Sequence, residues 1–209
     1  MAHIHNFSAG PSILPKSVFE EASRAVVDFN GSGLSILEMS HRSKDFVAVM
    51  DEARSLVKEI LGLGDDYDVL FLQGGASTGF LISAYNMLRE NNRGGYINTG
   101  SWANKAVKEG KWVGDALEVA SSKEANYNFI PKGYESPTDV DYLHYTSNNT
   151  IFGTQYHHIP DVTVPLVCDM SSDIFSRPID ASKFDLIYAG AQKNMGPAGT
   201  TVYIFKKEI

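Results

Sequence analysis

The sequence predicts an α/β protein built on a mostly parallel, seven-stranded sheet with helices on both faces. Two amphipathic helical segments open the chain, and from Tyr67 onward short apolar runs alternate with helical or loop stretches. That alternation is typical of parallel strands, because each parallel connection must cross back over the sheet and usually does so as a helix.

The two opening helices are predicted over residues 17–28 and 45–61, after an extended segment at residues 1–15. In both, apolar residues recur at spacings of three and four, which places them on one face of a helix. Each run stops at glycines, around Gly31 and Gly62, as helices commonly do.

Seven short apolar runs read as strands. Helices over residues 78–90 and 102–111 follow the first two strands, and residues 121–138 are rich in proline and glycine and read as a loop. The connection before the last strand is too short for a parallel crossover, so this strand is predicted to be antiparallel to its neighbour. The strands are at residues 69–72, 96–98, 117–119, 142–145, 166–169, 186–188 and 200–205.

Composition narrows the class of protein. The chain has 209 residues, 43% of them hydrophobic, and a net charge of -7, which argues against nucleic acid as a main partner. The single cysteine, Cys168, excludes an internal disulfide and suits a reducing, cytoplasmic setting, with Cys168 as a buried strand residue. No membrane span, signal peptide or zinc-ligand spacing is visible, so neither a membrane partner nor a metal is expected.

Lys193 directly follows an apolar strand and stands among small residues. A lysine there either reaches solvent or forms a Schiff base with an aldehyde cofactor, since burial of an unpaired ammonium is costly. Local context alone leaves both readings open.

Residues 73–80, between the first strand and its helix, form a turn of small residues in which the backbone can approach an anion at a helix amino terminus. Ser77 adds a hydroxyl donor. The turn matches neither the dinucleotide nor the P-loop pattern, so a nucleotide site is poorly supported.

Three further residues follow predicted strands. Trp102 offers an aromatic face for a planar ring or for core packing, and Thr150 offers a hydroxyl for a ligand or a turn. Asp169 ends a buried strand and needs a cation or donors to stay ionised, which a pyridinium nitrogen would supply. Open parallel sheets bind ligands at the carboxyl ends of their strands, and the set together describes pyridoxal 5'-phosphate (PLP).

The chain resembles the phosphoserine aminotransferases, fold type I enzymes of the class V aminotransferase group. The resemblance spans essentially the whole chain. The blocks that carry it are Asn6-Phe7-Ser8-Ala9-Gly10-Pro11, Ser40-His41-Arg42-Ser43-Lys44-Asp45-Phe46, Gly74-Gly75-Ala76-Ser77, residues 169–180 and Tyr188-Ala189-Gly190-Ala191-Gln192-Lys193-Asn194.

The resemblance implies that Lys193 holds PLP as a Schiff base and moves the proton between substrate and cofactor, while Asp169 keeps the pyridine nitrogen protonated. It implies that Trp102 stacks on the ring and Thr150 lies near the phenolic oxygen. It assigns the phosphate to Ala76, Ser77 and Gln192.

By the same resemblance His41 and Arg42 anchor the substrates, glutamate and 3-phosphohydroxypyruvate, in a step of serine biosynthesis. Phosphohydroxythreonine, from pyridoxine biosynthesis, is a related substrate. Family members act as homodimers and continue into a small carboxyl-terminal domain. We therefore expect residues 16–209 to be an incomplete PLP-binding large domain, inactive alone unless a companion carboxyl-terminal fragment completes it.

Two alternatives stay open. One is another class V enzyme, such as a serine-pyruvate type aminotransferase or a cysteine desulfurase. The other is a noncatalytic fragment of the PLP fold, against which the intact Lys193 and Asp169 argue. His41, Arg42 and the Ser-Arg-Pro-Ile-Asp block favour a phosphoserine aminotransferase.

Overall fold

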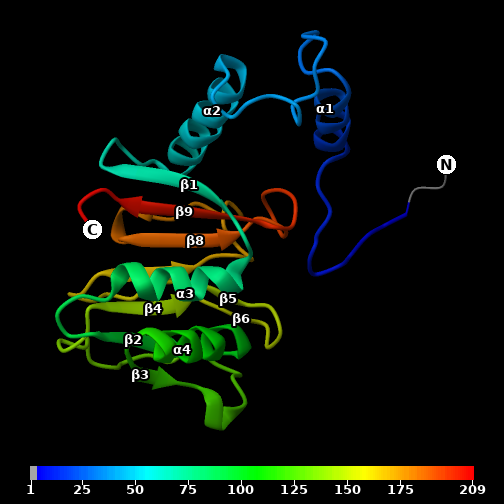
Figure 1. Ribbon diagram of the computed structural model, residues 1–209. Helices are drawn as coiled ribbons and strands as arrows, with labels where there is room; N and C mark the ends of the chain where they lie inside the picture. Colours follow the sequence, from blue (N-terminus) through cyan, green and yellow to red (C-terminus); the bar gives the residue numbers. More distant parts are fainter. Residues whose placement is uncertain (1–3) are drawn as a thin grey trace.

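The protein is described here by a computed structural model of residues 4–209, so residues 1–3 of the predicted extended segment lie outside the described residues. Two helices, α1 (Lys16–Val27) and α2 (Lys44–Leu61), precede the sheet and lie beyond one of its edges (Figure 1). Ser43 caps α2 by accepting a hydrogen bond from the backbone N–H of Phe46, and Gly62 ends it in the left-handed conformation.

The centre of the molecule is a seven-stranded sheet in the order β1-β9-β8-β7-β4-β2-β3. Strand β9 is antiparallel to both of its neighbours, which confirms the prediction for the last strand, and the other pairings are parallel. The strands are β1 (Tyr67–Gln73), β2 (Arg93–Asn98), β3 (Asp115–Ser121), β4 (Tyr142–Thr146), β7 (Leu166–Asp169), β8 (Leu186–Gly190) and β9 (Thr200–Lys206).

Helices α3 (Ala76–Met87) and α4 (Ser101–Val113) lie side by side on one face of the sheet (Figure 1). Helix α3 ends three residues before the predicted end. The reason is Asp141, whose carboxylate accepts backbone N–H groups of Arg89, Asn91 and Arg93 and so holds that segment in a non-helical path.

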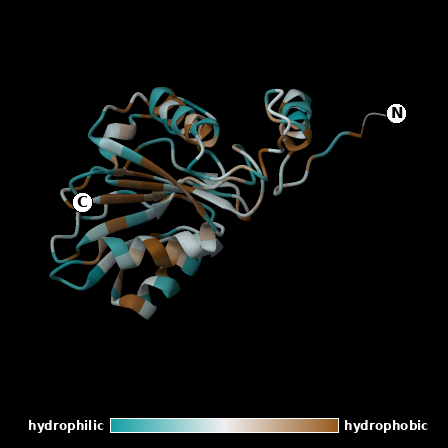
Figure 2. Ribbon diagram, turned by 45° about the horizontal axis from the view of Figure 1, so that its top comes forward, coloured by the Kyte–Doolittle hydropathy of each residue, from teal (hydrophilic) through white to brown (hydrophobic). Residues whose placement is uncertain are grey.

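The two faces of the sheet form separate apolar layers. Tyr96, Val167 and Tyr188 pack under α3 and α4 with Phe80 and Met87. Their strand neighbours point to the other face, since side chains alternate along a strand. That layer is covered mainly by irregular segments, and α2 adds two residues to it from the β1 edge. It includes Val57, Leu61, Ile97, Leu143, Cys168 and Ile187. The hydrophobic residues accordingly concentrate in the central strands (Figure 2), and Cys168 is buried as predicted.

Two short features were not predicted. A two-stranded hairpin, β5 (Asn148–Asn149) with β6 (Thr154–Gln155), follows β4, and single 3₁₀ turns occur at Lys123–Ala125 and Ala181–Lys183. The hairpin holds Thr150 in its turn beside the carboxyl end of the sheet. Among the described residues no helix is long and apolar enough to cross a membrane.

Candidate functional site

A cavity of about 200 Å³ lies at the carboxyl ends of β4, β7 and β8, beside the start of α3. Six of the residues predicted to bind a cofactor line it, and the seventh, Thr150, is joined to them by hydrogen bonds. The residues around the cavity are Gly75, Ala76, Ser77, Trp102, Thr146, Asn148, Asp169, Ser171, Ser172, Gln192 and Lys193.

Lys193 follows β8 in a turn, and its side chain is half-buried against the amino-terminal segment. A Cβ built on Gly10 would lie 3.5 Å from Lys193 Cγ and 3.6 Å from Cε, so the backbone of the amino-terminal segment lies directly beside the lysine side chain. The Lys193 ammonium donates to Thr150 Oγ1 at 3.3 Å. Burial lowers the pKa of Lys193, and the charge of Asp169 partly offsets this. A lowered pKa increases the neutral amine, which is the nucleophilic form.

Asp169 is the last residue of β7 and is only 3% exposed. Its Oδ1 accepts from the backbone N–H of Ser171 at 3.0 Å and from the Ser171 hydroxyl at 2.5 Å, and that hydroxyl accepts from Gly190 N–H. Burial raises the pKa of Asp169 to about 6, against the opposing effects of the Ser171 hydrogen bonds and of Lys193. A buried carboxyl of this kind binds a cationic N–H group well, because the cation restores the charged form.

Ala76 and Ser77 begin α3, where backbone N–H groups have no partner within the helix. The end of β8 comes close to them. A Cβ added to Gly190 would lie 2.7 Å from Gln192 Oε1 and 3.4 Å from the Ala76 nitrogen, so a side chain at Gly190 would displace the Gln192 amide. The amide of Gln192 and the start of α3 therefore converge on one small volume suited to an anion.

Trp102 and Thr150 close the side of the cavity next to α4. Trp102 is half-buried in the first turn of α4, and its indole Nε1 donates to Thr150 Oγ1 at 3.0 Å. The same oxygen accepts from Lys193, so Thr150 links the aromatic ring to the lysine. The indole is thus fixed at the cavity wall.

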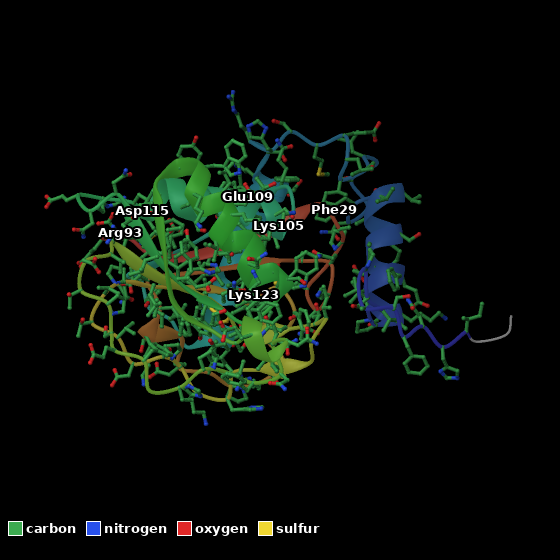
Figure 3. All side chains as sticks on the ribbon, turned by 90° about the horizontal axis from the view of Figure 1, so that it is seen from below. Phe29, Arg93, Lys105, Glu109, Asp115 and Lys123 are labelled. Atoms are coloured by element: carbon green, nitrogen blue, oxygen red, sulfur yellow. The ribbon has the colours of Figure 1, made fainter. Side chains whose placement is uncertain are left out.

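The sequence reasoning missed several residues of this site. Thr146 lines the cavity, and its hydroxyl is buried without a hydrogen-bond partner among the described residues. Ser171 supports Asp169, and Lys105 donates to Ser77 Oγ at 2.7 Å. Ser171 lies in a block that the resemblance already singled out, whereas Lys105 looks like any helical surface lysine in the sequence. Figure 3 labels Lys105 on α4.

The structure does not bring His41 and Arg42 into this cavity. Both are exposed on the segment between α1 and α2, and neither is among the residues that line the cavity. The predicted cofactor residues are therefore assembled within one chain, whereas the predicted substrate residues lie apart from them.

Comparison with known proteins agrees with this geometry. Residues 4–209 match the family model described as aminotransferase class-V. The chain belongs to the class-V aminotransferase family. The family match covers the whole described chain, including every residue of the cavity.

Among its relatives, the phosphoserine aminotransferase of Flavobacterium johnsoniae is 66% identical over 206 residues, which are 98% of this chain and 58% of the relative. The structure of the phosphoserine aminotransferase from Bacillus circulans subsp. alkalophilus superposes with a TM-score of 0.93 at 48% identity, covering 97% of this chain and 57% of that one. The PLP-bound phosphoserine aminotransferase of Trichomonas vaginalis gives a TM-score of 0.90 at 35% identity, over 97% and 58% of the two chains. This chain thus spans less than two thirds of the length of each.

Proposed function

We propose that this chain carries the PLP site of a phosphoserine aminotransferase, which transfers an amino group from glutamate to 3-phosphohydroxypyruvate. The observation that carries the proposal is the placement of Lys193 and the buried Asp169 in one cavity with the start of α3. The residues fit PLP at three points, because an amine, a buried carboxyl and an anion cradle face the same volume. Residues 16–209 are then the PLP-binding domain.

PLP, when bound, acts as an electron sink for the bond cleaved at the substrate Cα. The chain's own residues would prepare that chemistry. Asp169 would hold a proton on the ring nitrogen, Lys193 would bind the cofactor covalently and then carry a proton at Nζ, and Trp102 would pack against the ring. The hydroxyl of Thr150, which accepts a hydrogen bond from Lys193, would lie near the phenolic oxygen.

The phosphate would lie at Ala76, Ser77 and Gln192, where helix N–H groups, a hydroxyl and an amide provide donors. Thr146, whose buried hydroxyl has no hydrogen-bond partner within residues 4–209, would add a further donor or acceptor for the ring substituents.

His41 and Arg42 are proposed as the substrate anchors, and they would act from a second copy of the chain. Support comes from α1, none of whose residues is buried. Its apolar side chains are left in solvent, with Phe19 53% and Val27 78% exposed. Exposed apolar faces of this kind mark protein contacts. A homodimer would cover α1 and carry an exposed His41-Arg42 pair toward the partner's cavity, where the guanidinium could bind a carboxylate or phosphate.

The first test is covalent attachment. The protein, purified at its native length, is mixed with PLP, reduced with borohydride and digested, and the peptides are analysed by mass spectrometry. We expect PLP on Lys193, and Lys193→Ala should abolish both the adduct and the visible absorption band. PLP found on another lysine, or no adduct at all, would contradict the proposal.

The second test concerns the substrate. A different class V enzyme, for example a serine-pyruvate type aminotransferase, would use alanine or serine as donor. We expect turnover with phosphoserine and 2-oxoglutarate, and a large rise in the KM for phosphoserine in Arg42→Ala with the cofactor band unchanged. Preference for alanine over phosphoserine would instead favour the alternative.

A phosphoserine aminotransferase would act in serine biosynthesis. Phosphohydroxythreonine, from pyridoxine biosynthesis, would be its second substrate. Both reactions suit the cytoplasm.

A further inference from the structure

Lys105 is a half-buried cation with an unusual partner. It projects from the second turn of α4, and its ammonium donates to the hydroxyl of Ser77 at 2.7 Å. Within residues 4–209 the ion pairs involve other lysines and arginines, and no carboxylate lies within ion-pair distance of Lys105. Glu109, one turn further along α4 (Figure 3), forms no such pair with it. Among residues 4–209, the Lys105 ammonium therefore donates its one hydrogen bond to a neutral hydroxyl.

The position of that hydroxyl makes the contact more informative. Ser77 lies in the first turn of α3, where the helix dipole already places partial positive charge. A lysine ammonium at a helix amino terminus is electrostatically unfavourable, because two positive potentials meet. An anion bound beside the start of α3 would interact favourably with both the ammonium and the helix dipole.

Ser77 also lines the cavity that contains Lys193 and Asp169. Lys105 itself lies outside the residues that line the cavity, so it reaches the cavity through Ser77. The Ala76 and Ser77 N–H groups, the Gln192 amide and Lys105 thus approach the same point from α3, the β8 turn and α4. Of these groups only Lys105 carries a full charge.

We propose that Lys105 is a cofactor-positioning residue that binds the phosphate of PLP as a dianion, either directly or by fixing the Ser77 hydroxyl. The proposal rests on the proposed function, since it assigns a charge partner to the phosphate of that same cofactor. Neutral donors alone would leave two negative charges uncompensated by any full positive charge at this end of the cavity, whereas the ammonium balances one of them.

The experiment compares PLP with pyridoxal, which has the aldehyde and the ring but lacks the phosphate. Dissociation constants of both are measured by absorbance titration of the apoprotein at native length, for the wild type, Lys105→Gln, Lys105→Arg and Lys108→Gln. Lys108 is an exposed lysine of the same helix, so Lys108→Gln removes the same charge without the contact to Ser77.

We expect Lys105→Gln to weaken PLP binding by about tenfold, the effect of one charge-assisted hydrogen bond at a partly exposed site, with pyridoxal binding unchanged. Lys105→Arg should recover most of the PLP affinity, and Lys108→Gln should match the wild type. The phosphorus NMR signal of bound PLP should remain that of the dianion to lower pH in the wild type than in Lys105→Gln.

Three results would overturn the proposal. Equal weakening of PLP and pyridoxal would mean that Lys105 only supports the fold, and unchanged PLP binding in Lys105→Gln would mean that it does not act on the phosphate. If Lys108→Gln weakened PLP binding as much as Lys105→Gln does, the loss of affinity would come from the change in net charge and not from the contact with Ser77. Each of these leaves the proposed function standing as long as the wild type binds PLP, whereas a wild type that binds neither compound removes both.

Discussion

Asp169 gives a quantitative prediction about stability. In the folded protein its pKa is raised from 3.8 to about 6, mainly by burial. Protonation is therefore favoured in the folded state, so the carboxyl contributes stability that is fully present below about pH 4 and is lost as the pH rises through about 6. At about 1.36 kcal/mol per pH unit, the ionised carboxyl costs the cofactor-free protein about 3 kcal/mol at neutral pH.

Asp169→Asn removes this titration while keeping an oxygen to accept from Ser171 N–H and Oγ. Urea unfolding of the cofactor-free wild type and variant gives the free energy of unfolding of each across the pH range. The free energy of unfolding of the variant, minus that of the wild type, should increase by about 2 kcal/mol between about pH 4 and about pH 7.5. Most of the increase should occur between about pH 4 and about pH 6. Taking the difference between the two proteins cancels the other titrating groups.

At saturating PLP the wild type should become more stable than Asp169→Asn at neutral pH, because a protonated ring nitrogen gives the Asp169 carboxylate the cation that it lacks in the apoprotein. The reasoning would be refuted by a difference in unfolding free energy that stays constant with pH. It would also be refuted by a variant that binds PLP as tightly as the wild type.

Two further predictions concern the packing beneath the site. A Cβ on Gly79 would lie 2.7 Å from Tyr188 Cδ2, so Gly79→Ala should push α3 off β8 and destabilise the protein by about 1–2 kcal/mol in urea unfolding, despite alanine's better helix propensity. Gly196→Ala is the control, because its Cβ would lie no closer than 3.9 Å to any described residue other than its chain neighbours. A Gly79→Ala variant more stable than the wild type would contradict the prediction, because it would show that α3 and β8 can accommodate the added methyl group. Burial lowers the pKa of His144 from 6.5 to about 3, so its stability contribution is present above about pH 6.5 and lost as the pH falls toward 3. His144→Gln, which can still bond the Tyr188 hydroxyl, should lose less stability than the wild type between about pH 6.5 and about pH 4.5, and parallel curves would contradict this.

The order of elements could be predicted because the signals for it are local. Apolar periodicity and glycine stops located the four helices and seven strands to within a few residues, and a short connection was enough to make β9 antiparallel. The β5–β6 hairpin was missed because strands of two residues carry no periodicity. The early end of α3 was missed because it depends on Asp141, more than fifty positions along the chain from Arg89.

The candidate site divides in the same way. Lys193 and Asp169 could be singled out from the sequence because an ionisable residue directly after a buried strand is conspicuous, and parallel strands bring their carboxyl ends to one edge. The bonds of Thr150 to Trp102 and Lys193, and the bond of Lys105 to Ser77, join residues from different elements. Such contacts depend on how α3, α4, the β5–β6 hairpin and the turn after β8 pack against one another.

The sequence by itself determined which residues end the strands, and with them the chemical groups available to a cofactor. It could do so because the apolar pattern of a strand depends on residues that are adjacent in the chain. Only the tertiary structure decided the environment of those groups: the burial that raises the pKa of Asp169, the cation placed at the start of α3, and the separation of His41 and Arg42 from the cavity. The physical reason is that burial and charge pairing are set by the packing of distant segments, which no local pattern records.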